Sequence, residues 1–297
     1  MGNRLRKALT LETKSAPVIL LTPIFVFLLA ITIFPLIYAI ATSFQYFHLS
    51  DPLGRSFVGF KNYAYLLEDP RFWNSLKNTF QFITFSLLFE ITLGFVLALL
   101  LNQKFRGAGM AKTMVLLPMI TTPVVVALIW VMILDPQFGI FNYLMGQLGL
   151  KPQTWLSQEN TALWVIIGVD VWEWTLFVAL VLLSGLQSLP GEPFESAKVD
   201  GASKWQTFIH LTLPMMTNYI VIALVFRFMD AFRWFDTIYV MTKGGPGTAT
   251  ETINMYGYLT GFHFLNMGYA ATLGISMLLI IIILSQLLVK RVNMKGR

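Results

Sequence analysis

The chain has no cysteine, little charge and only three histidines, and each shortage excludes a class of protein. Without cysteine there can be no disulfide framework, thiolate chemistry or cysteine-based metal site. His48, His210 and His263 lie too far apart for their spacing to predict a metal site. Charged residues make up 12% of the 297 residues, whereas hydrophobic residues make up 56%. Because a soluble domain of this length could not bury so much apolar surface, the chain is predicted to lie in a membrane.

Signatures of catalysis are also missing from the sequence. No G-x-x-x-x-G-K-[ST] phosphate loop is present, and the glycine-rich 243-KGGPG-247 lacks its spacing, so ATP hydrolysis is not expected of this chain. An intramembrane enzyme is not favoured, because there is neither a metalloprotease motif nor a Ser–His pair within an apolar segment. The basic residues behind the net charge of +6 crowd at the ends of apolar segments, which membrane topology explains better than nucleic-acid binding does.

Six apolar segments are long enough for the roughly 20 residues with which a helix crosses hydrocarbon. They lie at about 17–44, 79–102, 113–134, 161–186, 214–235 and 269–289. An even number places both termini on one side, and the excess of Lys and Arg there predicts that this side is cytoplasmic. The first segment is longer than the apolar region of a signal peptide, so it is interpreted as a retained span. The expected fold is all-α, with residues 1–297 forming a single transmembrane domain.

A polar insert, 190-PGEPFESAKVDGASKWQTFIHLTLP-214, separates the fourth and fifth segments. Pro193 suits the first turn of a short helix, and 200-DG-201 signals a turn. Ser203 and Gln206 fit a capping box that begins a second helix. An apolar stripe at helical spacing follows, formed by Trp205, Phe208, Ile209, Thr212 and Leu213. This helix–turn–helix could rest on lipid headgroups or dock on a cytoplasmic partner, and the residues alone leave both possibilities open.

Ionisable residues also lie within the apolar segments, namely Glu90, Asp170, Glu173, Arg227, Asp230 and Arg233. Each costs about 2–3 kcal/mol at mid-bilayer by insertion scales, so these residues are expected to face a cavity or one another. Glu90 is isolated in its segment, which favours a structural polar partner. Arg227, Asp230, Arg233 and Asp236 are spaced at threes, so they could form an ion ladder along one helix or could contact a ligand.

The fourth segment contains 170-DVWEWTLF-177, in which Asp170, Glu173, Trp174 and Phe177 share one helical face. Carboxylates accept hydrogen bonds from hydroxyl groups, and aromatic rings pack against the C–H face of a pyranose. This face is therefore predicted to contact a sugar.

Three parts of the insert resemble the EAA loop of permease subunits from binding-protein-dependent ABC importers. They are 195-ESA-197, 200-DGA-202 and Ile209 with 213-LP-214, and Ser196 stands where the family usually has Ala. The stretches 116-LLPMITTP-123, 186-LQSLP-190 and 232-FRWFDTIYVMTKGGP-246 resemble the sugar-importing branch typified by the maltose permease, so the resemblance covers nearly the whole chain. It implies a type I ABC importer permease fold, with six transmembrane helices and a cytoplasmic helix–turn–helix coupling loop.

In that family the loop seats in a cleft on a cytoplasmic ATPase subunit. The resemblance implies this role for Glu195, Ser196, Ala197, Asp200, Gly201, Ala202, Trp205, Phe208, Ile209, Leu213 and Pro214. By the same resemblance and by their position in the spans, the substrate pathway is expected to include Met119, Thr122, Asp170, Glu173, Trp174, Phe177, Arg227, Asp230, Ala231, Arg233 and Trp234.

The resemblance further implies a multi-subunit importer in a bacterial inner membrane. Expected partners are a second homologous permease, a pair of ATPase subunits that bind ATP and Mg, an extracytoplasmic sugar-binding protein and membrane lipid. No catalytic residue, metal or cofactor is expected in this chain. The predicted substrate is a mono-, di- or oligosaccharide. A sugar alcohol, or an anionic sugar derivative or glycerol phosphate held by Arg227 or Arg233, is an alternative, and an ion-coupled secondary transporter is the alternative from another class.

Overall fold

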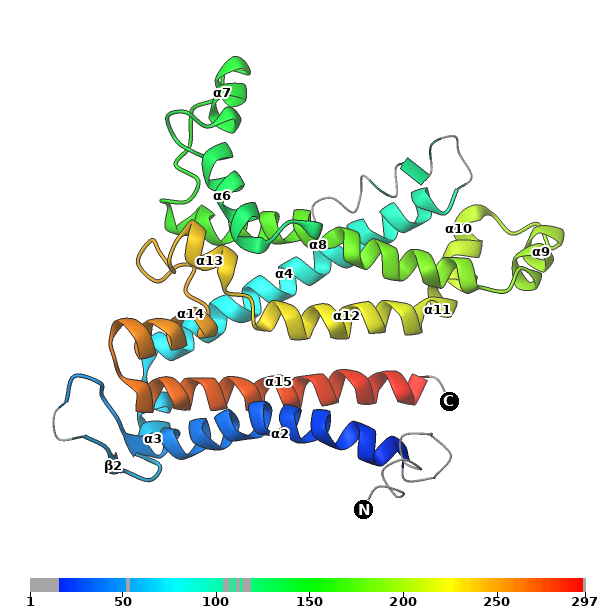
Figure 1. The fold of residues 1–297 in the computed structure, drawn as a ribbon. Coiled ribbons are helices and arrows are strands. Elements are labelled where there is room, and N and C mark those ends of the chain that lie inside the picture. Colours follow the sequence, from blue (N-terminus) through cyan, green and yellow to red (C-terminus); the bar gives the residue numbers. More distant parts are fainter. Residues whose placement is uncertain are drawn as a thin grey trace. The chain divides into compact units, whose positions relative to one another are not determined.

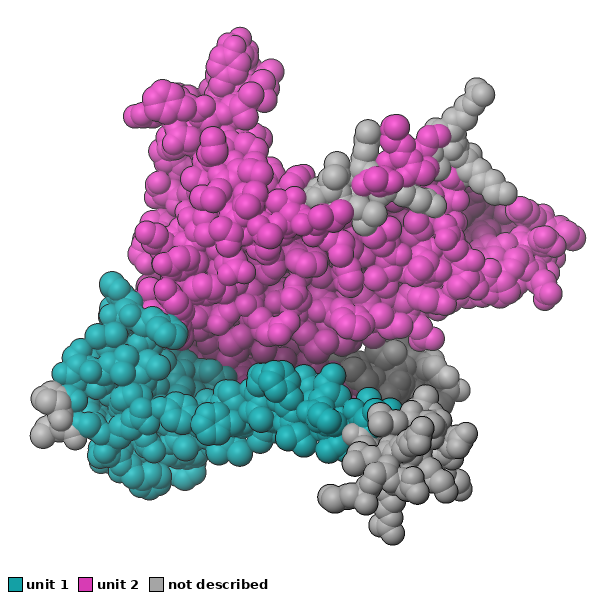
Figure 2. Space-filling model, viewed as in Figure 1, with its two compact units in different colours: residues 1–67, 260–275 teal, residues 68–259, 276–297 magenta. Residues whose placement is uncertain are grey.

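The computed structural model describes residues 16–51, 54–103 and 119–295, together with 107, 109, 110 and 113, and it is almost wholly helical (Figure 1). The chain divides into two compact units, shown in different colours in Figure 2. Unit 1 comprises residues 1–67 and 260–275, and unit 2 comprises residues 68–259 and 276–297. Residues 114–118 of the expected third span and the basic N-terminal residues fall outside the described part of the chain.

Unit 1 begins with α2 (Ala16–Ser43), which is followed by the short antiparallel strands β1 (Gln45–Tyr46) and β2 (Ser56–Phe57). Unit 1 also contains most of helix α3 (Lys61–Glu68), most of the π-helix η2 (Leu259–His263) and the start of α15 (Met267–Lys295). Asn62 Nδ2 donates hydrogen bonds of 2.8 and 2.9 Å to the carbonyl oxygens of Ser43 and Gln45. Gly268 lies so close to this turn that a Cβ atom there would be 2.2 Å from the Gln45 oxygen.

Unit 2 is built around α4 (Pro70–Leu101) and α8 (Glu159–Ser188), which pack along each other. Asp69 caps α4 by accepting a 2.9 Å hydrogen bond from the Arg71 backbone N–H. A Cβ atom at Gly94 of α4 would lie 2.8 Å from a methyl carbon of Val178 in α8, so glycine is what allows this close approach. Helix α12 (Thr217–Phe232) packs against both helices and completes the centre of the unit.

A clamp of polar contacts joins the loop at residues 242–252 to the first turns of α4. This loop lies between α13 (Asp236–Met241) and α14 (Ile253–Tyr258). Arg71 donates two hydrogen bonds, of 2.8 and 2.6 Å, to the Glu251 carboxylate, which is 1% exposed. Asn78 Nδ2 donates 2.8 and 3.2 Å bonds to the carbonyl oxygens of Thr248 and Glu251. We call these contacts the loop clamp. They order a connection that is long and rich in glycine.

The connection between α6 (Pro123–Ile133) and α8 is also ordered and carries α7 (Ile140–Gln147). The Asp135 carboxylate accepts hydrogen bonds from the backbone N–H groups of Phe138 and Gln137, and these bonds lower its pKa. The buried Asn142 side chain holds the returning chain, because its oxygen accepts a 3.0 Å bond from Trp155 Nε1 and its amide donates 2.9 Å to the Gln153 carbonyl. The aromatic and turn-forming residues of this connection therefore form a folded hairpin.

Four described helices are long and apolar enough to cross a membrane: Leu20–Ser43, Pro70–Leu101, Glu159–Ser188 and Met267–Leu287. Lys204–Met215 and Thr217–Phe232 together could form a fifth, although they are bent by 60°. Helix α6, within the expected third span, has 11 residues. The chain is a helical membrane protein with four or five apolar spans and a shorter apolar helix. The count of six spans stays a prediction.

Candidate functional site

The polar insert folds as two short helices joined by a turn (Figure 1). Helix α9 (Glu192–Val199) has Pro193 in its first turn, and α10 (Lys204–Thr207) follows. The predicted capping box is confirmed: Ser203 N–H donates 2.8 Å to the Gln206 side chain, and Gln206 N–H donates 3.2 Å to the Ser203 hydroxyl. Gly201 has a φ of 76°, a left-handed conformation that suits glycine at the turn.

The apolar stripe of the insert divides between two environments. After α10 the chain forms the π-helix η1 (Phe208–Thr212) and then α11 (Leu213–Met215), so the α-helical spacing behind the prediction does not continue. Trp205 is 69% exposed and stacks on Phe208. Phe208 is partly buried and meets Phe95 of α4 edge-on, and Thr212 is buried. Trp205, Ile209 and Leu213 therefore offer the exposed apolar surface of the stripe.

The remaining predicted coupling residues lie mostly at the surface. Those that are exposed are Glu195, Ser196, Asp200, Gly201 and Pro214, whereas Ala197 and Ala202 are half-buried. Ala202 N–H donates a 2.9 Å bond to the Ala197 carbonyl, which closes the turn between the two helices.

A buried ion cluster joins α4, α8 and α12 inside unit 2. Arg227 Nε and Nη2 donate 2.8 and 2.7 Å hydrogen bonds to the two oxygens of Glu90. Nη2 also contacts Asp170 at 3.1 Å, and Nη1 donates 2.9 Å to Asp230. The side chains of Arg227, Glu90 and Asp170 are at most 1% exposed. Such burial is tolerable only when charges are paired and hydrogen-bonded, and the bidentate fork on Glu90 provides this.

The cluster gives Glu90 a partner, and the ion ladder along α12 is shorter than predicted. Glu90 has a structural partner, as the sequence favoured, and that partner is Arg227. Within α12 the ladder consists of Arg227–Asp230 at 2.9 Å and Arg233–Asp230 at 3.6 Å. Asp236 lies in the next helix, α13, because α12 ends at Phe232. The predicted run of charges along one helix is therefore interrupted before its last member.

Aromatic rings lie directly beside the ion cluster. The Arg227 guanidinium carbon sits 4.7 Å from the centre of the Trp174 ring, a cation–π distance. Trp174 in turn meets Trp234 edge-on with ring centres 5.8 Å apart, and Phe177 at 6.3 Å. The structure thus places Trp174 of the α8 face beside Trp234, a second predicted pathway residue, which lies in the segment after α12.

Three polar atoms at this place are buried without a hydrogen-bond partner among the described residues. They are Glu173 Oε2, Trp174 Nε1 and Trp234 Nε1. Glu173 is 1% exposed, and within the described part of the chain it is the only ionisable side chain with such an atom. Because buried polar groups are nearly always paired, these atoms mark a place where a ligand or water can supply partners. We call Glu173, Trp174 and Trp234 the unpaired triad.

The other predicted pathway residues are placed less centrally. Ala231 is buried in α12, Arg233 is 68% exposed, Met119 is half-buried and Thr122 is exposed at the start of α6. The loop clamp was not predicted, because its acidic and basic partners, Glu251 and Arg71, are 180 positions apart and neither lies in a recognisable motif.

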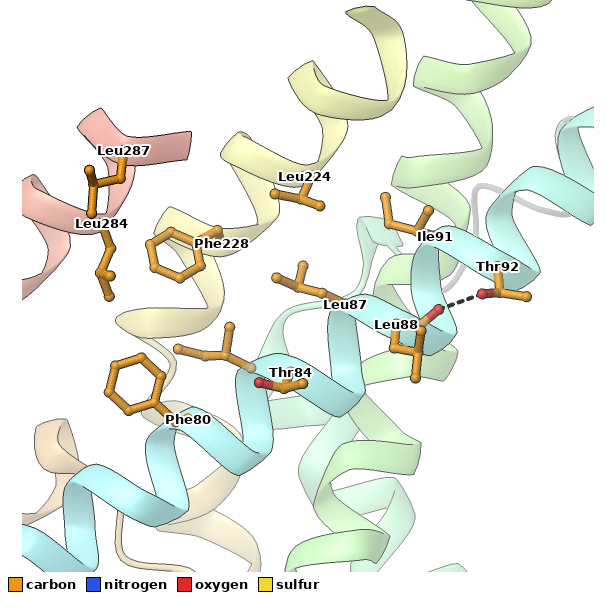
Figure 3. Close-up of a pocket in the computed structure, with 11 residues that line it drawn as sticks. Phe80, Thr84, Leu87, Leu88, Ile91, Thr92, Leu224, Phe228, Leu284 and Leu287 are labelled. Atoms are coloured by element: carbon orange, nitrogen blue, oxygen red, sulfur yellow. Dashed lines mark hydrogen bonds between the residues drawn. The ribbon is translucent and has the colours of Figure 1, made fainter. Parts of the chain in front are cut away.

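An apolar pocket of about 610 Å³ lies between α4, α12 and α15 in unit 2 (Figure 3). Its lining consists of Phe80, Ile83, Thr84, Leu87, Leu88, Ile91, Thr92, Leu224, Phe228, Leu284 and Leu287. No lining residue is charged, and the Thr92 hydroxyl already donates to the Leu88 carbonyl at 2.7 Å. The only side-chain polar groups in its lining are the hydroxyls of Thr84 and Thr92, so the pocket is suited to an apolar molecule more than to a hydroxylated solute.

Residues 90–295 match the family described as "Binding-protein-dependent transport system inner membrane component". This chain belongs to that family. It is therefore a permease of a binding-protein-dependent ABC importer and a multi-pass inner-membrane protein. Permeases of this family are not ATPases, and no cofactor is expected in them.

Individual relatives cover most of this permease. The trehalose/maltose transport system permease protein MalF of Thermococcus litoralis is 38% identical over 78% of this chain and 77% of its own length. The sulfoquinovosyl glycerol transport system permease protein SmoG of Agrobacterium fabrum is 34% identical over 91% of this chain and 87% of its own. A chain in the crystal structure of a bacterial ABC transporter involved in the import of the acidic polysaccharide alginate superposes with a TM-score of 0.82, 25% identity and 98% coverage of both chains.

Proposed function

We propose that this permease forms, with a second homologous permease, the translocation pathway for a sugar delivered by an extracytoplasmic binding protein. The unpaired triad carries the proposal: it has a buried carboxylate oxygen and two indole N–H groups without partners among the described residues, and its two indole rings meet edge-on. A sugar offers hydroxyl groups to pair these atoms and C–H faces to pack on the rings. The named substrates of the relative MalF, trehalose and maltose, are disaccharides and agree with this chemistry.

The proposed mechanism is alternating access driven by a pair of cytoplasmic ATPase subunits. The subunits close on ATP, and their motion passes through α9 and α10 to the spans, because α10 continues through η1 and α11 towards α12. The pathway then opens outward to receive the sugar, and hydrolysis resets it. The triad atoms are buried in this structure, so a sugar would reach them only after the surrounding side chains move.

The proposed function is tested by ATP-dependent uptake. The complex is reconstituted in proteoliposomes with its binding protein, and uptake of a panel of radiolabelled sugars is measured with and without ATP. We expect concentrative uptake of at least one sugar with ATP and none when ATP is replaced by an ion gradient. Uptake driven by the gradient alone, or a binding protein that retains only amino acids or peptides, would contradict the proposal.

Coupling through the insert is tested at two glutamates in the first turn of α9. Glu195 and Glu192 are both exposed, but the resemblance places only Glu195 in the ATPase cleft. We expect Glu195→Ala to reduce the rate of transport-coupled ATP hydrolysis by about tenfold or more. A tenfold change corresponds to about 1.4 kcal/mol, which is the size expected for the loss of one charge-assisted hydrogen bond. Glu192→Ala is the matched control and should stay near the wild-type rate. Equal effects of the two substitutions would remove the specific role of Glu195.

The orientation of the chain can be measured directly because it contains no cysteine. We propose that both termini and the insert are cytoplasmic and that the hairpin carrying α7 lies outside. Single cysteines introduced as Glu192→Cys and Gln137→Cys occupy exposed positions on these two elements. In intact cells a membrane-impermeant maleimide should label only the second, whereas in inverted vesicles it should label only the first. The opposite pattern would reverse the proposed topology.

A further inference from the structure

Arg227 is already committed to carboxylates of its own chain. Its Nε atom donates to Glu90, and its Nη1 atom donates to Asp230. Its Nη2 atom donates to both Glu90 and Asp170. The side chain is 1% exposed. Four of the five N–H donors of the guanidinium are thus used, so an anionic ligand could form a two-bond contact with it only by displacing one of these carboxylates. Displacement would leave a buried charge unpaired. Arg227, the buried arginine that could have bound an anionic ligand, therefore neutralises carboxylates of its own chain.

The surroundings of the unpaired triad carry more acidic than basic groups. Glu90, Asp170 and Asp230 contact Arg227, and Glu173 lies about one helical turn after Asp170 in α8. A second basic residue, Arg233, contacts Asp230 at 3.6 Å. Within the described part of the chain, Glu173 is the only one of these carboxylates with a buried oxygen that has no hydrogen-bond partner. Since electrostatic interactions are stronger in a buried site than in water, a second anion beside Glu173 would be repelled.

Glu173 and the two indoles require complementary partners. The carboxylate oxygen needs a donor, whereas Trp174 Nε1 and Trp234 Nε1 need acceptors. A hydroxyl group is both a donor and an acceptor, so neighbouring hydroxyls of one sugar can satisfy a carboxylate and an indole together. A carboxylate, sulfonate or phosphate group on the ligand would satisfy the indoles but would not donate to Glu173.

We infer that Glu173 is a specificity-determining residue, which accepts a hydrogen bond from a hydroxyl of an uncharged sugar and makes the pathway reject sugars that carry an anionic group. The inference rests on the proposed function and narrows its substrate class. It sets this permease apart from the relative SmoG, whose named substrate carries a sulfonate group, and from the alginate importer, whose named substrate is an acidic polysaccharide.

The test compares two ligands that differ at one carbon: trehalose and its derivative in which one CH2OH group is oxidised to a carboxylate, so that a hydroxyl donor is replaced by an anion. Binding of each is measured by saturation-transfer NMR on the complete permease–ATPase complex, held with a non-hydrolysable ATP analogue and without binding protein. Omitting that protein keeps its own selectivity out of the measurement. We expect trehalose to bind at least about tenfold more tightly, since unfavourable like-charge contacts cost more than about 1.4 kcal/mol.

Two variants locate the source of the selectivity. Glu173→Gln keeps the size of the side chain and removes its charge, so the preference for trehalose should fall at least about threefold. Lys151→Gln removes an exposed cation from the connection between α7 and α8, which is in none of the predicted sites, and should leave the preference unchanged. Tighter binding of the carboxylate by the wild-type complex, or an unchanged preference in Glu173→Gln, would overturn the inference. These outcomes are distinct from failure of the proposed function, which would appear as absence of ATP-driven uptake for every sugar in the panel.

Discussion

Replacement of Arg227 by methionine is expected to destabilise the permease by about 3–5 kcal/mol, the range for breaking a buried ion pair by removal of one partner. Methionine is long enough to fill most of the space, so the loss comes from charge. Glu90 would lose both of its hydrogen bonds and Asp170 its contact with Nη2, and neither carboxylate is exposed to water. Buried carboxylates without a basic partner would then lie at the contact between α4, α8 and α12.

The measurement is the midpoint of thermal unfolding of the detergent-purified permease, together with its yield from the membrane. Arg233→Met is the matched control, because that arginine is 68% exposed and makes only a 3.6 Å contact. Combining Arg227→Met with Glu90→Gln should recover part of the loss, since the second change removes one of the unpaired charges. An Arg227→Met protein as stable as the Arg233→Met protein would show that the cluster does not hold the helices together.

Replacement of Arg71 by methionine is expected to release the loop at residues 242–252. The Glu251 carboxylate is 1% exposed and receives two short hydrogen bonds from Arg71, so losing them costs about 3 kcal/mol. The backbone bonds from Asn78 to Thr248 and Glu251 would then hold the loop with less support. Hydrogen exchange of the amides between Thr242 and Thr252 should become faster.

The control for the loop clamp is Lys77→Met, which removes an exposed cation from the same helix. It should leave exchange in the loop unchanged. Substitution of the other partner, Glu251→Gln, should accelerate exchange in the loop less than Arg71→Met does. Arg71 is 34% exposed, so water can hydrate it when its partner changes. If the two substitutions accelerated exchange equally, the difference in burial between Arg71 and Glu251 would not determine how strongly each stabilises the loop.

Local features were predictable because their determinants are neighbours in the sequence. The capping box depends on Ser203 and Gln206, three positions apart, and the turn between α9 and α10 on Asp200 and Gly201. The face formed by Asp170, Glu173 and Trp174 follows from helical periodicity in the same way. The stripe after Trp205 was only partly predictable, because the change to a π-helix at Phe208 is not encoded in any apolar spacing.

Pairings between distant residues required the tertiary structure. Arg227 is 137 positions from Glu90 and 57 from Asp170, so from the sequence it could equally belong to an ion ladder or to an anion site. Only the packing of α12 against α4 and α8 commits its donors to those carboxylates. The structure therefore shows the ion-pair role of Arg227, whereas a contact with the substrate stays a prediction.

The sequence by itself determined that the chain is a mostly helical membrane protein of the importer family, where the polar insert lies and which residues occupy its turn and caps. These properties follow from composition, periodicity and short motifs, which act over a few residues. The tertiary structure decided which buried charges are neutralised and which polar atoms of Glu173, Trp174 and Trp234 have no partner among the described residues. Burial and pairing depend on helices brought together from distant parts of the chain, and no local pattern specifies them.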